Sequence, residues 1–454
     1  MTEQNFFGSE KVWKILLKLA PPVMLAQLIQ ALYNIVDSFF VGKYSNDALT
    51  ALTVIYPLQL IIIALAVGTG VGVNTYMARK YAQGDEQAAN YAAGCGTVLA
   101  VATWALFSVI SIDIMRPYVM TSAKSPRAIE DAVIYGNIVC VGSLGSFLEG
   151  NWSKVHQAKG NMRLPMIAQV VGAVINIVLD PVLIFGWWIF PEMGVAGAAI
   201  ATVAGQVAAA VITGVKGAHK PPKIRQMPHY IKRIYFYGYS SIFMQELYTV
   251  YIVVFNIILA GFSDAAVTVL GLYYKLQSFF FIPLFGLQTC IVPIISYNFT
   301  KADYDRCKSI MTDSFIVSVA FMAVGIVCFV FFPEQLARLF SGSEEVVVIA
   351  KVAFPIIGSS FIAAAFSLMM PVFFQAIGNG KVSLLLSLTR QIFCLIPLFW
   401  LFSLIGLNYA WIAFPVSEFV AGGIGIILFV LQTKKWAASR TGIMNANSLN
   451  SFGS

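Results

Sequence analysis

The sequence predicts an all-α integral membrane protein with twelve transmembrane helices. Of its 454 residues, 59% are hydrophobic and 11% are charged, whereas about a quarter of the residues of a soluble protein carry charge. Twelve mainly apolar stretches are each long enough to cross a hydrocarbon core, which takes about 20 helical residues. The residue-by-residue alternation that is typical of a membrane β-barrel is absent.

The basic residues between these stretches predict their orientation, because lysine and arginine are retained on the cytoplasmic side of a membrane. If the chain starts inside, 21 basic residues fall in inner segments and 6 in outer loops. We therefore expect a multi-pass protein of the inner cell membrane with both termini in the cytoplasm. The predicted helices are centred on residues 15–39, 51–77, 91–115, 131–153, 164–186, 194–215, 234–260, 267–297, 311–332, 349–376, 382–404 and 408–432.

The two halves of the chain repeat each other. An offset of 218 residues pairs Gln27 with Gln245, Tyr56 with Tyr274, Gln59 with Gln277, Asp85 with Asp303, and QAxGN at 157–161 with QAxGN at 375–379. Six helices return the chain to its starting side, so the halves have the same orientation. We expect an N-terminal lobe at 1–217, a cytoplasmic linker at 218–233, a C-terminal lobe at 234–435 and a polar, disordered tail at 436–454.

Several function classes lack their motifs. The net charge of +8 belongs to the cytoplasmic connections, so a nucleic-acid partner is not indicated. The six cysteines are scattered without a CxxC pair or a histidine cluster, so neither a disulfide framework nor a zinc site is predicted. No P-loop or HExxH motif occurs, which argues against an enzyme and a cofactor. Without an arginine-rich sensor or a repeated filter loop, a channel is also disfavoured.

Polar residues inside the first half predict an ion site. Gln27, Gln30, Asn34 and Asp37 recur at a spacing of three to four residues, which places them on one helix face, as it does for Asn176 with Asp180 and for Thr202 with Gln206. An ionisable group near the bilayer centre costs about 2.5 to 3.5 kcal/mol. Two carboxyl groups in a poorly solvated pocket cannot both stay ionised, so one is expected to hold an exchangeable proton. The same oxygens could instead bind Na⁺, and the sequence leaves both open.

The second half carries charges with less obvious roles. Glu246 either forms an ion pair with Lys275 or binds a cationic substrate directly. Arg390 is expected to reach the cytoplasmic interface with its long side chain, while Glu418 stands alone on its helix.

The chain resembles the multidrug and toxic compound extrusion (MATE) family over about residues 10–435. The resemblance rests on QLIQALYNIVDSFFVG, GTGVGVNTYMARKYAQGD, HQAKGNMRLPM leading into NIVLDPVLIFG, GVAGAAIAT and the later FFQAIGNGK. It implies two six-helix lobes in a V, a central cleft, and alternating access driven by H⁺ or Na⁺. Asp37, Asn176, Asp180 and Thr202 match positions linked to cation binding, and Tyr135 matches a tyrosine of that network.

In another branch of the family, Glu246 would match a glutamate of the seventh helix. That branch also has an acidic residue in its tenth helix, which the segment SLMMP at 367–371 lacks, so the resemblance favours coupling in the first lobe. Gln30, Asn34, Tyr135, Gln206, Glu246 and Lys275 are the candidates for the polar lining of the cleft.

Two functions from different classes follow. The first is a secondary antiporter that expels organic cations and amphiphilic drugs in exchange for H⁺ or Na⁺, with no cofactor and no obligate protein partner. The second is a flippase or exporter of a lipid-linked cell-envelope precursor, which would need more Lys or Arg in the cleft. Because the charges inside the helices are mostly acidic, the first is favoured.

Overall fold

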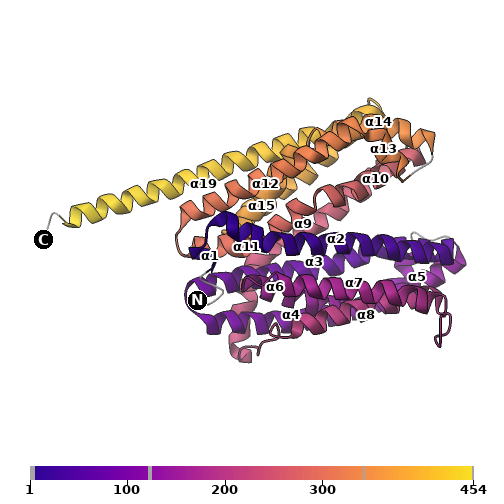
Figure 1. Cartoon of the computed structure of the whole chain (residues 1–454), viewed down its shortest axis with the longest axis horizontal. Helices are drawn as coiled ribbons and strands as arrows, with labels where there is room; N and C mark the ends of the chain where they lie inside the picture. The colour runs from indigo at the N-terminus through magenta and orange to yellow at the C-terminus, as the bar shows by residue number, and fades with distance from the viewer. Residues whose placement is uncertain (1–5, 121–124, 341–342, 452–454) are drawn as a thin grey trace. The chain divides into compact units, whose positions relative to one another are not determined.

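The computed structural model describes residues 6–120, 125–340 and 343–451, and the regular structure in these ranges is helical throughout (Figure 1). The chain divides into two compact units that interleave in sequence. Unit 1 comprises Met1–Val250 and Phe281–Tyr297, and unit 2 comprises Tyr251–Phe280 and Asn298–Ser454.

Unit 1 is a bundle of long helices. Its helix α7 packs against α2 and α8, and α3 packs against α4, α5 and α6. Its elements are α1 (Phe6–Ser9), α2 (Val12–Tyr44), α3 (Asn46–Ala82), α4 (Glu86–Met120), α5 (Pro126–Gly142), α6 (Leu144–Ala158), α7 (Arg163–Ile184), α8 (Gly194–Gly214), η1 (Ile224–Gln226), the first part of α9 (Met227–Ala260) and most of α11 (Ile282–Thr300).

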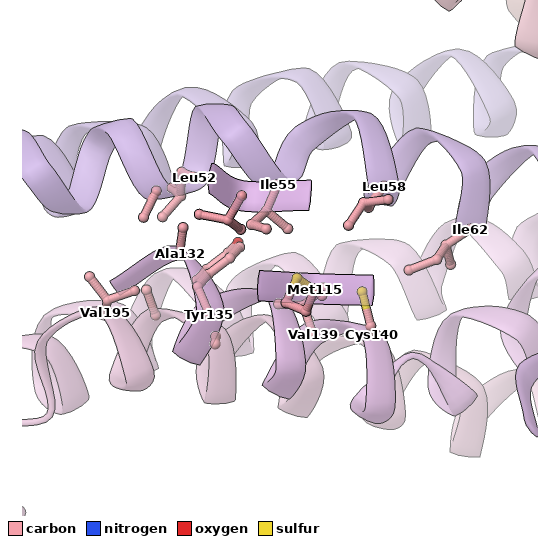
Figure 2. Close-up of a cluster of buried hydrophobic side chains, with 14 of the residues drawn as sticks. Leu52, Ile55, Leu58, Ile62, Met115, Ala132, Tyr135, Val139, Cys140 and Val195 are labelled. Atoms are coloured by element: carbon pink, nitrogen blue, oxygen red, sulfur yellow. The ribbon is translucent and has the colours of Figure 1, made fainter. Parts of the chain in front are cut away.

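An apolar cluster centred on α3 and α5 forms one core of unit 1, and it includes Met115 of α4 and Val195 of α8. Figure 2 shows Tyr135 lying among these aliphatic side chains, close to Ile55. Tyr135 is almost fully buried, with 2% of its surface exposed. This packing positions its hydroxyl group for the polar site described below, because the ring has little room to move.

Unit 2 is built in the same way. Helix α15 packs against α12, α16 and α19, and η2 packs against α19. Its elements are the rest of α9, α10 (Asp264–Phe280), α12 (Tyr304–Phe331), α13 (Pro333–Arg338), α14 (Glu344–Gly358), α15 (Phe361–Ala376), α16 (Gly380–Leu388), the π-helix η2 (Thr389–Leu395), α17 (Ile396–Ser403), α18 (Leu407–Ala410) and α19 (Ala413–Ser451).

The predicted all-α, multi-pass membrane fold is confirmed. Within the described ranges, ten helices are long and apolar enough to cross a membrane, and two bent pairs bring the total to twelve if each pair is one span. The bent pairs, α5 with α6 and α14 with α15, correspond to the predicted helices 131–153 and 349–376. The predicted helix 267–297 is divided at Phe281 into α10 and α11.

Both bends coincide with serine side chains that hydrogen-bond to the preceding turn. The α5–α6 pair bends by 41° at Ser143, whose Oγ donates to the Cys140 carbonyl oxygen at 2.6 Å. The α14–α15 pair bends by 55°, and the Ser360 Oγ donates to the Ile357 carbonyl oxygen at 2.6 Å. Such back-bonding, next to glycine, bends helices.

The backbone of the two halves repeats at the same offset of 218 residues. Gly160 and Gly378 both have φ of +83°, and Gly84 and Ala302 have φ of +76° and +56°. At the next position after this second pair, an aspartate caps a helix in each half. The Asp85 side chain accepts from the Ala88 N–H, and the Asp303 side chain accepts from the Arg306 N–H.

The predicted division of the chain into lobes and linker stays a prediction, since the compact units have other bounds. The linker region is part of unit 1, where a methyl group added at Gly94 of α4 would lie 2.3 Å from the Lys220 carbonyl oxygen. The predicted disorder of the tail at 436–454 also stays a prediction. Helix α19 is described as far as Ser451. Residues 452–454 lie outside the described ranges.

Candidate functional site

A cluster of buried polar side chains lies inside unit 1 and takes one or two residues from each of four helices. Asp37 comes from α2, Tyr135 from α5, Asn176 and Asp180 from α7, and Thr202 from α8. All five are buried, and Asp180 is fully inaccessible to solvent. In an apolar bundle such groups are stable only if they satisfy one another.

The amide of Asn176 links two members of this cluster. Its Nδ2 donates to the Asp180 Oδ1 at 3.3 Å and to the Thr202 Oγ1 at 3.4 Å. Because residues 176 and 180 are one helical turn apart, the first contact follows directly from the sequence spacing. The second contact fixes the amide between α7 and α8, so Asn176 orients the Asp180 carboxyl group.

The two carboxyl groups meet. The Asp37 and Asp180 side chains are within hydrogen-bonding reach of each other. Each also keeps one buried oxygen, Asp37 Oδ1 and Asp180 Oδ2, that accepts from no donor among the described residues. A carboxylate has only acceptors, so a direct bond between the two groups requires one of them to carry a proton. The arrangement can therefore hold and release a proton.

Tyr135 closes the cluster on the side of α5. A hydrogen bond joins it to the Thr202 side chain, and the Gln59 Nε2 donates to the Tyr135 hydroxyl at 3.2 Å. Tyr33, four residues before Asp37 on α2, interacts electrostatically with both aspartates and is hydrogen-bonded to Gln30. A chain of polar groups thus runs from Gln59 to the paired carboxyl groups.

Sequence reasoning missed Tyr33 and Gln59. Both had a signal. Tyr33 is one turn from Asp37, and Gln59 is among the residues that pair with the second half at the fixed offset. The hydroxyl group of a buried tyrosine also needs a hydrogen-bond partner, which is a further reason to expect Tyr33 beside polar groups.

Other predicted lining residues lie apart from the cluster. Asn34, one turn before Asp37 on α2, is exposed, so its place in the lining of a cleft stays a prediction. Gln206 is half-buried, and its amide oxygen has no donor within the described ranges. Glu246 is half-buried in unit 1, while Lys275 is exposed in unit 2, so a pair between them stays a prediction.

For Arg390, the prediction was wrong. Arg390 does not extend to the interface, because it forms a buried ion pair inside unit 2 with Glu418, which is carried by another helix. The side chains keep 7% and 4% of their surface exposed. Burial of one charge without the other would be strongly unfavourable, which explains why both occur on packed elements, η2 and α19.

Metal ligation has no support in the described ranges, where no three His, Cys, Asp or Glu side chains gather. The polar cluster of unit 1 offers two carboxylates, an amide and a hydroxyl instead. Such oxygens suit a proton or a small hard cation.

The fold and the buried acids define a membrane transporter, and comparison with known proteins gives its family. The MatE family profile matches residues 22–182 and 240–401. The chain therefore belongs to the MatE family of transporters, and it is not an enzyme.

Similar characterised sequences span nearly the whole chain. A protein of Shewanella oneidensis called "FAD transporter" is 24% identical over 433 residues, covering 93% of this chain and 95% of that protein. The "Probable multidrug resistance protein NorM" of Thermotoga maritima is 28% identical over 385 residues, covering 78% of each. The "Multidrug export protein MepA" of Staphylococcus saprophyticus is 22% identical over 438 residues, covering 94% and 96%.

Solved structures share the fold. A MOP superfamily transporter from Pyrococcus furiosus, described as having a binding pocket of reverse polarity, superposes with a TM-score of 0.89 at 21% identity, covering 96% of this chain and 99% of that one. A multidrug resistance MATE family transporter in an outward-facing conformation gives a TM-score of 0.89 at 20% identity, covering 96% and 99%.

Proposed function

We propose that this protein is a secondary active exporter that expels organic cations and other amphiphilic drugs in exchange for protons, by alternating access. The observation that carries the proposal is the contact between the Asp37 and Asp180 carboxyl groups in a buried, hydrogen-bonded cluster. Members of the family use ion gradients rather than cofactors.

Loss of the proton shared by Asp37 and Asp180 is the step that drives the conformational change. Without it, two like charges lie together in a poorly solvated bundle and repel each other. Because Asp37 is on α2 and Asp180 on α7, that repulsion acts on the packing between these helices. Thr202 and Tyr135 extend the same network to α8 and α5, so protonation is coupled to the arrangement of four helices of unit 1.

Export of drugs is supported by relatives whose names are multidrug export or resistance proteins. The ionisable groups of the unit 1 cluster include two carboxyl groups, Asp37 and Asp180, whose negative charge would attract cationic compounds. A flippase for a lipid-linked pyrophosphate gains little support, because a doubly charged pyrophosphate calls for more than the single guanidinium group of Arg390, which is paired with Glu418, and Lys275 is exposed.

The coupling ion is tested with purified protein in proteoliposomes, under a proton gradient or a Na⁺ gradient applied separately. We expect efflux of a cationic dye under the proton gradient, and its loss in Asp37→Asn. The matched control is Asp113→Asn, the same chemical change at an exposed position of α4. Efflux under the Na⁺ gradient alone would show that the coupling ion is Na⁺ and not the proton. Unimpaired efflux in Asp37→Asn would remove this residue from the mechanism.

We also propose that the protein lies in the inner cell membrane with both termini in the cytoplasm. The basic residues of the connections support this orientation. In a chain freed of its native cysteines, a membrane-impermeant maleimide is expected to label Lys43→Cys in intact cells and to leave Lys435→Cys unlabelled. The reverse pattern would invert the proposed topology.

A further inference from the structure

The second half contains a buried ion pair that the proposed proton cycle does not use. Arg390 Nη2 donates to Glu418 Oε1 at 2.6 Å, and Arg390 Nε lies 3.0 Å from each Glu418 oxygen. The Ser367 hydroxyl donates to Glu418 Oε2. Both Glu418 oxygens are therefore satisfied by donors from η2 and α15.

The guanidinium group, in contrast, has donors to spare. The hydrogen bonds of Arg390 within the described ranges come from its Nε and Nη2, and none comes from its Nη1. The hydroxyl groups of Tyr251 and Tyr273 interact electrostatically with Arg390, and Tyr251 also does so with Glu418. Arginine can thus offer further hydrogen bonds to a ligand at this position.

The backbone at Arg390 is unusual. Residues Thr389–Leu395 form a π-helix between the α-helical segments α16 and α17. Single π-helical turns within α-helices are rare and occur frequently at functional sites. An aromatic wall is close by, where the Phe255 and Phe399 rings stack with centroids 3.8 Å apart and Tyr251 contacts Phe255 edge-on at 5.5 Å.

The ion pair lies on elements that match the proton cluster in the internal repeat. Subtracting the offset of 218 places Arg390 and Glu418 at Gly172 and Ile200, on α7 and α8. These are the helices that carry Asp180 and Thr202. Tyr251 corresponds in the same way to Tyr33, which interacts with Asp37 and Asp180. Each half thus holds a buried cluster of ionisable side chains on equivalent helices. The cluster of the first half has two carboxyl groups, whereas the opposite charges of Arg390 and Glu418 cancel in the second half.

We propose that Arg390 binds the carboxylate or phosphate group of a transported aromatic amphiphile, and that Glu418 occupies this position when no such ligand is present. Guanidinium groups recognise these anions through two parallel hydrogen bonds, and the aromatic side chains beside Arg390, Tyr251 and Tyr273, contact the aromatic body. The inference deepens the proposed function, on which it rests, by adding anionic and zwitterionic compounds to the substrate class.

Displacement of Glu418 from Arg390 by a ligand changes the protonation state of Glu418. A Glu418 carboxylate that leaves Arg390 would be a buried charge without a partner, which is strongly unfavourable. Glu418 therefore takes up one proton as the ligand binds. The other groups that face Glu418 are Arg390 on η2, Tyr251 on α9 and Ser367 on α15, and Tyr273 on α10 faces Arg390. Of these, Arg390 stays charged.

The test measures equilibrium binding of pyrenebutyrate, a carboxylate, and of pyrenemethylamine, a cation of similar body, to the purified full chain in an uncharged detergent. Uptake of one proton predicts that pyrenebutyrate binding strengthens about tenfold for each pH unit of acidification. In Glu418→Gln, binding should be tighter and independent of pH. If the affinity of the unaltered protein for pyrenebutyrate does not change with pH, the proposal is overturned.

A second variant excludes a merely structural role. Replacing both partners in the double variant Arg390→Met with Glu418→Met removes the charges without leaving one unpaired, a change that folded proteins commonly tolerate. It should keep pyrenemethylamine binding and lose pyrenebutyrate binding. Equal binding of pyrenebutyrate by this variant would refute the proposal. Should it fail to fold, Arg390→Lys serves instead, with an expected loss of about tenfold or more because lysine lacks the planar fork.

The two proposals fail separately. Asp37→Asn should abolish proton-driven efflux and leave pyrenebutyrate binding unchanged, because Asp37 belongs to the other cluster. If efflux persists in Asp37→Asn while the pH-dependent binding at Arg390 is observed, the proposed coupling is wrong and the anion site stands.

Discussion

The carboxyl groups of Asp37 and Asp180, 143 positions apart in the sequence, lie within hydrogen-bonding reach of each other in the interior of unit 1. They are carried by α2 and α7, which pack directly against each other. A bond between two carboxyl groups requires a proton on at least one of them, because two carboxylates have only acceptors. The packing of these two helices and the occupancy of the proton are therefore linked, which is the property that an exchanger of protons for drugs requires.

The hydroxyl of Thr202 is expected to tune this pair through Asn176. Thr202→Val keeps the shape of the side chain but leaves an Asn176 N–H without its acceptor, which costs about 1 to 3 kcal/mol. Proton-driven dye efflux should fall and its dependence on pH should shift, and Thr202→Ser should restore both. The control is Thr213→Val on the same helix, because the Thr213 hydroxyl bonds only to the carbonyl oxygens of Ala209 and Ala210. Equal losses in both valine variants would show a general effect on α8.

At matched backbone positions of the internal repeat, replacing glycine by alanine and replacing alanine by glycine should have opposite effects on stability. Gly160→Ala and Gly378→Ala should each lower thermal stability by a similar amount, about 1 to 2 kcal/mol, because both positions have positive φ, which disfavours a Cβ atom. Ala302→Gly should raise stability, since Ala302 already has that strained conformation where its counterpart is Gly84. Melting temperatures in detergent measure all three. A stabilising effect of either glycine replacement would contradict the equivalence.

The sequence predicted the membrane fold and the polar members of the unit 1 cluster because both depend on local composition. Hydrophobic stretches of fixed length define spans, and the spacing of Asn176 and Asp180 places them on one helix face. The bends at Ser143 and Ser360 were not foreseen, since they depend on which carbonyl each serine contacts. The pairing of Arg390 with Glu418 was also missed, because it joins elements 28 residues apart that only the packing of η2 on α19 brings together.

Close approach of α3 to α9 within unit 1 depends on glycine. A methyl group added at Gly72 would lie 2.2 Å from the Ile234 carbonyl oxygen, a distance that forces the helices apart. Gly72→Ala should therefore destabilise the protein by about 1 to 3 kcal/mol. The control is Gly271→Ala, since an added methyl group meets nothing within 4 Å at that position of α10. That control should be stabilised by about 0.5 to 1 kcal/mol, because alanine favours helices. Thermal unfolding in detergent compares the two, and equal effects would argue against the close contact.

Within unit 1, the region before α9 is held to the end of α6 by a contact between two basic side chains. The Lys159 Nζ lies 3.1 Å from His219 Nε2, and the His219 Nδ1 lies 2.9 Å from the Gly217 carbonyl oxygen. Lysine can only donate, so His219 Nε2 is the acceptor and the ring is neutral, with its proton on Nδ1. Burial lowers the pKa of His219, as does the charge of Lys159, and burial also lowers the pKa of Lys159.

Acidification should therefore release this segment. A histidine whose pKa is lowered in the folded state binds fewer protons there than in the unfolded state, so its contribution to stability falls as the pH drops through about 6.5, the ordinary histidine value. A proton on Nε2 would also face the Lys159 ammonium group. Amide hydrogen exchange of residues 216–223, corrected for the intrinsic effect of pH, should become faster below this pH. His219→Gln keeps an acceptor and does not titrate, so its exchange should lack that acceleration. The same acceleration in His219→Gln would assign the effect to another group, of which His156, the other histidine that senses Lys159, is the nearest candidate.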